Sequence, residues 1–193
     1  MKNLRCDAEF IKSVRGNSGL MYSVRIQSGD RTGLEEGVPN GTFVKVGDLE
    51  TGEREIRKAV KPVATELPGI VIRGEVNYAE NYKTDSLWGK FRNRVANPLP
   101  VAKLSVGDFI GLSEDYFPSG EISTIAVGHK YGIDTAGGFV AGTQLKKTDS
   151  PTTGDVVFEV VEVKDNHIPT YLMGDGKLTK PYKMISVEVK IAE

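Results

Sequence analysis

The sequence predicts a mainly β protein: a compact β-barrel or β-sandwich with long loops and an extended N-terminal arm. Short runs rich in Val, Ile, Phe and Thr alternate apolar with polar residues, which is the period of a half-buried strand. Gly, Asn, Asp and Pro separate these runs, as expected of turns. No long stretch repeats its apolar residues about every 3.6 positions, as a helix would. We therefore expect about nine to eleven strands of about five residues each.

The composition is that of a folded globular protein. Of the 193 residues, 39% are apolar and 26% are charged, and 25 basic and 26 acidic side chains leave a formal net charge of -1. This balance argues against a nucleic-acid binder that relies on overall positive charge. Cys6 is the single cysteine, which excludes an intramolecular disulfide and a four-cysteine zinc site. Because we find neither a signal-peptide pattern nor a membrane-spanning apolar run, we expect folding in a cytosol and no membrane partner.

Residues 1–19 are expected to form an N-terminal arm, followed by a single mainly β domain over residues 20–193. The arm is poor in apolar residues and ends in the loop-forming run Gly16-Asn17-Ser18-Gly19. Such an arm can become ordered when it binds a partner. Leu20 to Gln27 is the first predicted strand of the domain. Its alternation predicts one common face for Leu20, Tyr22, Val24 and Ile26.

The stretch from Asn40 to Pro62 predicts a β-hairpin. Asn40-Gly41 tolerates the positive φ of a tight turn, and Thr42–Val46 is a short β-type run. We expect a second turn at Gly47-Asp48. The Glu and Arg residues of Glu53–Val60 would suit a helix, but its β-branched positions and the flanking turns favour a returning strand.

The second half of the chain continues to alternate strands with turns. Val156–Val163 is apolar on both faces, which predicts a central strand. In Ile185–Ile191, the apolar residues Ile185, Val187, Val189 and Ile191 alternate with polar ones and are expected to point inward. The other predicted elements are strands at Ile70–Ile72, Val101–Leu104, Phe109–Leu112 and Ile122–Val127, a hairpin within Gly128–Gly142, and a polar connection at Gln144–Gly154.

Residues 77–99 form a predicted loop insertion that mixes aromatic and basic side chains. A loop of this length in a compact domain usually has a function or a partner. Trp88 and Phe91 would either fasten the loop onto the core or anchor a protein interface, in which Trp, Tyr and Arg are enriched. Stacking on nucleic-acid bases is a third interpretation, which the balanced charge disfavours. The predicted partner-binding residues in arm and loop are Phe10, Ile11, Tyr78, Tyr82, Trp88, Phe91, Arg92 and Arg94.

We find no pattern that predicts catalytic residues, a cofactor or a metal site. His129 and His167 each lack a second ligand at metal-binding spacing. Asp108 and Asp115 could pair as in a glycoside hydrolase, but such pairs arise by chance in a chain with 26 acidic residues. The run Gly16-Asn17-Ser18-Gly19 is one residue short of a nucleophile elbow. We therefore predict a protein that is not an enzyme and needs no cofactor.

The Asn40–Pro62 stretch also resembles a segment of a known family, the decoration (cement or auxiliary head) proteins of tailed bacteriophages. The resemblance covers most of the chain from about Leu20 onward, and Ile122–Gly154 departs from the family pattern by being longer and richer in glycine. The matching runs are Asn40-Gly41-Thr42-Phe43-Val44-Lys45-Val46-Gly47-Asp48-Leu49, Gly52-Glu53-Arg54-Glu55, Ala59-Val60-Lys61-Pro62, Gly69–Glu75, the loop 77–99, Leu104–Ile110, Val156–Val163 and Met184–Ile191.

This resemblance implies a virion protein that is made in the host cytoplasm and placed on the capsid surface. Its partner would be the major capsid protein, whose subunits it would bridge at or beside three-fold positions, and a homotrimer is favoured. Neither nucleic acid nor a membrane would be a partner. Two alternatives stay open: another virion element, such as a head-fibre base or a tail or baseplate β-barrel, and a β-sandwich carbohydrate-binding module that stacks sugars on Tyr78, Tyr82 and Trp88.

Overall fold

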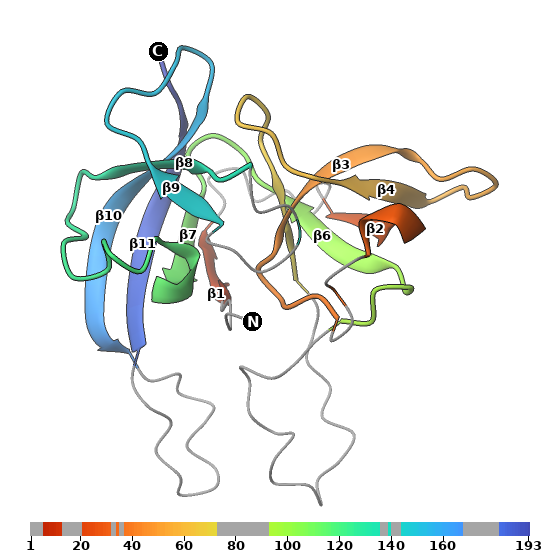
Figure 1. Ribbon diagram of the computed structural model, residues 1–193, viewed down its shortest axis with the longest axis horizontal. Coiled ribbons are helices and arrows are strands. Elements are labelled where there is room, and N and C mark those ends of the chain that lie inside the picture. The colour runs from red at the N-terminus through yellow and green to blue at the C-terminus, as the bar shows by residue number, and fades with distance from the viewer. Residues whose placement is uncertain are drawn as a thin grey trace, which may run out of the picture.

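The described residues form two β-sheets that lie side by side, a six-stranded sheet and a closed five-stranded barrel (Figure 1). The computed structural model describes residues 6–12, 21–31, 34, 37–72, 93–135, 139, 144–167 and 182–193, and for 6–12, 166, 167 and 182 it describes the backbone alone. Within these ranges, helical structure is confined to short 3-10 turns such as η2 (Ser28–Asp30) and η4 (Glu114–Tyr116). The mainly β class predicted from the sequence is confirmed.

The barrel consists of five short strands in the order β2-β4-β3-β5-β6, and β6 closes it by pairing with β2. Neighbouring strands are antiparallel except β2 and β4, which run parallel. Because the barrel is closed, each of its strands has two neighbours and none is an edge strand. The strands are β2 (Met21–Ile26), β3 (Phe43–Leu49), β4 (Ile56–Val60), β5 (Gly69–Val71) and β6 (Leu99–Lys103).

The second sheet is antiparallel throughout and has the order β1-β7-β11-β10-β8-β9. Its two long strands, β10 and β11, lie in the middle and form a hairpin. The prediction of a central Val156–Val163 strand is confirmed. The strands are β1 (Cys6–Lys12), β7 (Phe109–Ser113), β8 (Lys130–Ile133), β9 (Leu145–Lys147), β10 (Val156–His167) and β11 (Tyr182–Ile191).

Alternation along the barrel strands divides side chains between an interior and an outer wall. Val24 and Ile26 of β2 are buried in the barrel interior, and Tyr22 of the same face packs at its margin, so the predicted face of this strand is confirmed. The described residues of this cluster are Val24, Ile26, Leu34, Val38, Val44, Ala59, Val71, Leu99, Val101 and Phe139, with Tyr22, Val46 and Val95 packed against it.

Strand β5 and the first two residues of β3 are buried on both faces, and this joins the barrel to the sheet. Val44 and Val71 face the barrel interior, whereas their neighbours Phe43 and Ile70 belong to the hydrophobic core of the six-stranded sheet. Adjacent apolar residues are typical of strands covered on both sides. Phe43 stacks on Phe158 of β10 with ring centroids 5.3 Å apart. The two sheets therefore share one core and pack as a single body.

The inward face predicted for the last strand is confirmed at three of its four residues. Ile185, Val187 and Val189 of β11 are buried in the shared core. Ile191 is 45% exposed, because it stands at the end of the strand, where only Val156 pairs with it. The prediction was wrong for this last residue.

The predicted strand at Ile122–Val127 is wrong, because these residues form turns. The Thr124 N–H and hydroxyl both donate to the carbonyl of Glu121, at 2.9 and 3.0 Å, and Gly128 has a φ of 87°. Ile125 is the one buried side chain of the segment. The alternating pattern here had no neighbouring strand to pair with, so local side chain–backbone hydrogen bonds determined the structure.

The turn predicted at Gly47-Asp48 is also wrong, because β3 continues through both residues to Leu49. The register with β4 shifts between Val46 and Leu49, which marks a bulge. A Cβ on Gly47 would lie 2.9 Å from the Cγ2 of Val60, so this glycine allows a close side-chain approach instead of a turn. The reversal comes later, around Gly52, whose φ is 85°. The returning strand predicted within Glu53–Val60 is confirmed as β4.

Three further segments differ from the expectation. Cys6–Lys12, expected as part of a loose arm, pairs with β7 as the edge strand β1. Leu145–Lys147, expected inside a polar connection, is strand β9 and pairs with β8, so the hairpin extends beyond the predicted range Gly128–Gly142. The strands β6 and β7 are joined by a turn at Ser105–Asp108, but they belong to different sheets. This turn is therefore the crossing point from barrel to sheet.

Candidate interaction surface

Most of the predicted partner-binding residues lie outside the part of the chain that the structure describes. Tyr78, Tyr82, Trp88, Phe91 and Arg92 lie outside the described residues. Phe10 and Ile11 lie on β1, whose backbone alone is described. Arg94 is exposed at the start of a turn that the Asn97 N–H closes onto its carbonyl at 3.1 Å. The interface on the loop 77–99 therefore stays a prediction.

The C-terminal end of that loop is fastened to the barrel by Asn93, a contact that sequence reasoning missed. Asn93 is 1% exposed and exchanges two backbone hydrogen bonds with Val38, of 2.7 and 2.9 Å. Its side-chain Nδ2 also donates to the Val38 carbonyl at 3.1 Å and to Asn40 Oδ1 at 3.0 Å. The exposed Arg94 therefore follows directly after a residue that is held in place beside the Asn40-Gly41 turn. Asn93 and Asn40 are 53 positions apart in the sequence, so this contact becomes visible only in the folded structure.

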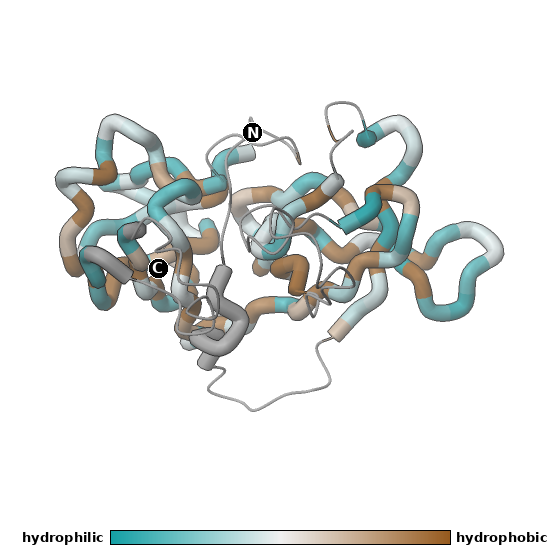
Figure 2. The backbone as a smooth tube through the Cα atoms, turned by 90° about the horizontal axis from the view of Figure 1, so that it is seen from below, coloured by the Kyte–Doolittle hydropathy of each residue, from teal (hydrophilic) through white to brown (hydrophobic). Residues whose placement is uncertain are grey.

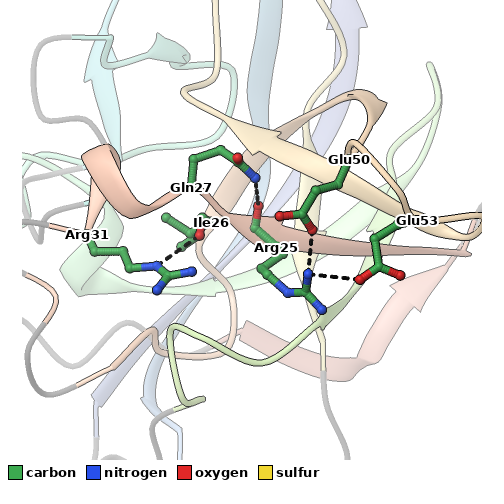
Figure 3. Close-up of polar contacts among 6 residues, drawn as sticks. All are labelled: Arg25, Ile26, Gln27, Arg31, Glu50 and Glu53. Atoms are coloured by element: carbon green, nitrogen blue, oxygen red, sulfur yellow. Dashed lines mark hydrogen bonds and ion pairs between the residues drawn. The ribbon is translucent and has the colours of Figure 1, made fainter.

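A half-buried ion-pair cluster fastens the β3–β4 connection to β2 (Figure 3). Arg25 Nη1 contacts Glu50 Oε2 at 2.6 Å and Glu53 Oε1 at 3.2 Å. Lys58 lies opposite Arg25 in the parallel pairing of β2 with β4. Arg31 Nε donates to the Ile26 carbonyl at 3.0 Å and secures the exit of β2. These contacts hold the hairpin in its orientation against β2.

The far end of the β3–β4 hairpin projects from the barrel and is hydrophilic (Figures 1 and 2). Exposed apolar side chains occur both on strands and in turns. Two of them, Val127 at 66% and Val161 at 40% exposure, flank the same point of β10, since the Gly128 N–H donates to the Val160 carbonyl at 2.8 Å. The large apolar residues exposed among the described side chains are Met21, Leu49, Val60, Val63, Val106, Val127, Val161 and Ile191.

Among the described residues, β8 pairs with only the first part of β10. β8 pairs with β10 from Val157 to Glu159, and His129 and Gly128 extend this pairing to Val160. β10 continues to His167 in pairing with β11, and its register shifts between Val160 and Glu162 and between Lys164 and His167.

Asp108 and Asp115, the two acids considered as a catalytic pair, lie in a turn and in a 3-10 helix. Asp108 is 3% exposed, and its Oδ2 accepts a hydrogen bond from the Ser105 N–H at 2.7 Å, which shapes the turn between the two sheets. Asp115 lies in η4. Within the described ranges, no group of three or more His, Cys, Asp or Glu side chains is placed to hold a metal ion.

One titratable group in the sheet is strongly perturbed. Burial, followed by the negative charge of nearby Glu121, raises the pKa of Tyr131 to about 12. Tyr131 lies on β8, where its ring packs edge-on against Phe117 with centroids 4.8 Å apart. Its phenol is therefore held neutral in the shared core, as a structural group.

A scan against protein-family models, a search of curated proteins and a search of solved structures find no match to this chain. In the described part of the chain, no helix has the length and apolar character needed to cross a membrane.

Proposed function

We propose that this protein decorates and stabilises the outer surface of a phage capsid by binding the major capsid protein. The proposal is carried by the Asn40–Pro62 motif, on which the resemblance to phage decoration proteins rests. Its residues form one continuous hairpin of the barrel: Gly41 and Gly52 supply the positive φ values of 87° and 85° at two turns. Glu53 pairs with Arg25, and Ala59 is buried in the barrel. Because the residues of the motif form one structural unit, the resemblance to phage decoration proteins is supported as that of a whole hairpin.

The proposed mechanism relies on contact area and avidity. The loop 77–99 would supply the aromatic and basic anchors, because its end is fixed at Asn93 and Arg94 is exposed beside that anchor. A standard protein interface buries about 800 Å² on each partner. Assembly as a homotrimer would multiply such contacts through effective concentration. In this role the protein has no substrate and no cofactor.

Sedimentation of the purified protein with assembled empty phage heads tests the proposal. We expect the protein to pellet with the heads, saturate at a fixed copy number, and remain in the supernatant without them. Trp88→Ala should reduce the bound amount while the melting temperature of the free protein stays unchanged, and Val106→Ala, at an exposed turn position, is the matched control. Failure to bind heads would overturn the capsid role. Binding to tails or fibres, seen by electron microscopy, would favour another virion position.

A further inference from the structure

We propose that the Asn40-Gly41 turn is a site of spontaneous deamidation, which the folded structure keeps slow. Asparagine is a thermolabile residue, and a glycine that follows it has no side chain to hinder attack by its backbone nitrogen. Asn40-Gly41 is the one Asn-Gly pair among the 193 residues of the sequence. The reaction takes place within the chain itself, so it does not depend on the proposed capsid role.

The reaction needs water as its only co-reactant. The backbone nitrogen of Gly41 attacks Cγ of Asn40, and the Cγ–Nδ2 bond breaks. The side-chain nitrogen leaves as ammonia, with the proton that the Gly41 N–H gives up. Water then opens the succinimide ring in one of two ways. Cleavage of the new bond leaves aspartate at position 40, whereas cleavage of the original peptide bond leaves isoaspartate, which adds one atom to the main chain.

The folded turn restrains both reacting groups. Gly41 is buried, and its N–H donates to the Val71 carbonyl at 2.7 Å, so the attacking nitrogen keeps its proton and its position. The half-buried Asn40 is held by its side-chain oxygen, which accepts a hydrogen bond from Asn93 Nδ2 at 3.0 Å. The Thr42 hydroxyl also donates within the turn, to the carbonyl two residues before Gly41, at 2.9 Å. Ring closure therefore requires a local opening of this turn.

Asn93 is the gate of the reaction, because one side chain fastens two parts of the structure. We call its hydrogen bonds to Asn40 and Val38 the Asn93 clasp; those to Val38 measure 2.7 and 2.9 Å from the backbone and 3.1 Å from Nδ2. Opening the clasp releases the Asn40 amide for ring closure. Conversely, isoaspartate lengthens the turn by one main-chain atom and should loosen the clasp. Ordinary aspartate keeps the chain length and an acceptor oxygen, so it should leave the clasp in place.

Mass spectrometry of the peptide that contains Asn40 tests the proposal, as a time course in mildly alkaline buffer with and without urea. The folded wild type should react about tenfold or more slowly than the urea-unfolded chain, because only the locally opened turn reacts. Asn93→Asp keeps the shape of the side chain but removes its donor group, so the folded variant should react several-fold faster than the folded wild type. Asn93→Ala should do the same if the first variant does not fold. In urea, all three chains should react alike.

Two controls separate the clasp from general stability and from charge. Ile185→Val trims a buried side chain of the sheet core and should deamidate like the wild type. Asn40→Asp should keep slow hydrogen exchange at the Asn93 and Val38 N–H groups, whereas the purified isoaspartate form should exchange faster there.

Three results would overturn the proposal. The first is a urea-unfolded chain that yields no deamidated product, or a folded wild type that reacts as fast as the unfolded chain. The second is a rate in the folded Asn93 variants that equals the wild-type rate or that Ile185→Val matches. The third is an isoaspartate form whose exchange at Asn93 and Val38 equals that of the wild type.

Discussion

The barrel and the six-stranded sheet treat the edges of their strands differently. The barrel pairs β6 with β2 and leaves no strand edge open. The sheet begins at β1 and ends at β9, and its longest strand, β10, extends beyond its neighbour β8. Closure makes the barrel complete by itself, whereas the sheet has two end strands. We infer that the barrel provides a rigid support.

The largest expected effect comes from breaking the joint between the two parts. Phe43 is an outer-wall residue of the barrel, yet its ring lies between Phe158 and Tyr116, with centroid distances of 5.3 and 5.7 Å. Phe43→Ala should lower the free energy of unfolding by about 3–5 kcal/mol, since a cavity opens in the shared core. Chemical denaturation measures the loss. Hydrogen exchange should show faster opening in strands of both sheets.

The alternative outcome for this variant is informative. If barrel and sheet were independent, Phe43→Ala would affect exchange only in the barrel and would cost about 1 kcal/mol or less, as surface substitutions do. Lys45→Ala, two residues along the same strand and exposed, is the matched control. It should leave exchange in β10 and β11 unchanged.

A smaller effect is expected from overfilling the barrel at Gly69. A Cβ at this position would overlap the Cγ1 of Val101, because β5 and β6 are adjacent strands of the closed wall. Gly69→Ala should destabilise the protein by up to about 3 kcal/mol, the upper end for overpacking. Gly29→Ala has open space around the new methyl group and serves as the control in the same denaturation experiment.

A double variant tests whether the overlap with Val101 causes the loss of stability in Gly69→Ala. If the overlap with Val101 is responsible, adding Val101→Ala to Gly69→Ala should recover part of the lost stability, although Val101→Ala alone destabilises the core. Purely additive losses in the double variant would contradict the steric explanation.

Local sequence pattern predicted much of the fold but little of its pairing. The alternation in β2 and β11 and the apolar run in β10 predicted these strands and most of their buried residues, because each is covered by a core. Ile122–Val127 shows the same alternation and forms turns, since in the described structure it pairs with no strand. The sequence also cannot show that β6 and β7 belong to different sheets, because that depends on which distant strands each one meets.

For the candidate surfaces, too, the sequence showed the composition but not the contacts. The aromatic and basic composition of the loop 77–99 was visible in the sequence, but its anchor was not, because Asn93 meets Val38 and Asn40 only in the folded barrel. The partial pairing of β10 with β8 was hidden for a similar reason. Val156–Val163 reads as one central strand, yet β8 pairs with only its first half. How far one strand pairs with the next depends on the length of both, which local patterns do not reveal.

The smallest effect depends on pH. The pKa of Tyr131 is raised from 10.0 to about 12 in the folded protein, so between these values the folded chain holds a proton that the unfolded chain has released. The stability due to this group is therefore complete below pH 10 and is lost as the pH rises through about 12. The loss should be on the order of 2 kcal/mol.

Comparison with Tyr131→Phe isolates this contribution from that of the other tyrosines. The free energy of unfolding, measured by urea denaturation at several pH values, should fall more steeply above pH 10 for the wild type than for the variant. Parallel pH profiles would contradict the buried neutral phenol. The variant also separates the two parts of the molecule, because Tyr131 lies in β8 and belongs to the sheet's core. If barrel and sheet unfold together, the barrel strands should show the same alkaline loss of hydrogen-exchange protection, and in Tyr131→Phe both losses should shrink by the same amount.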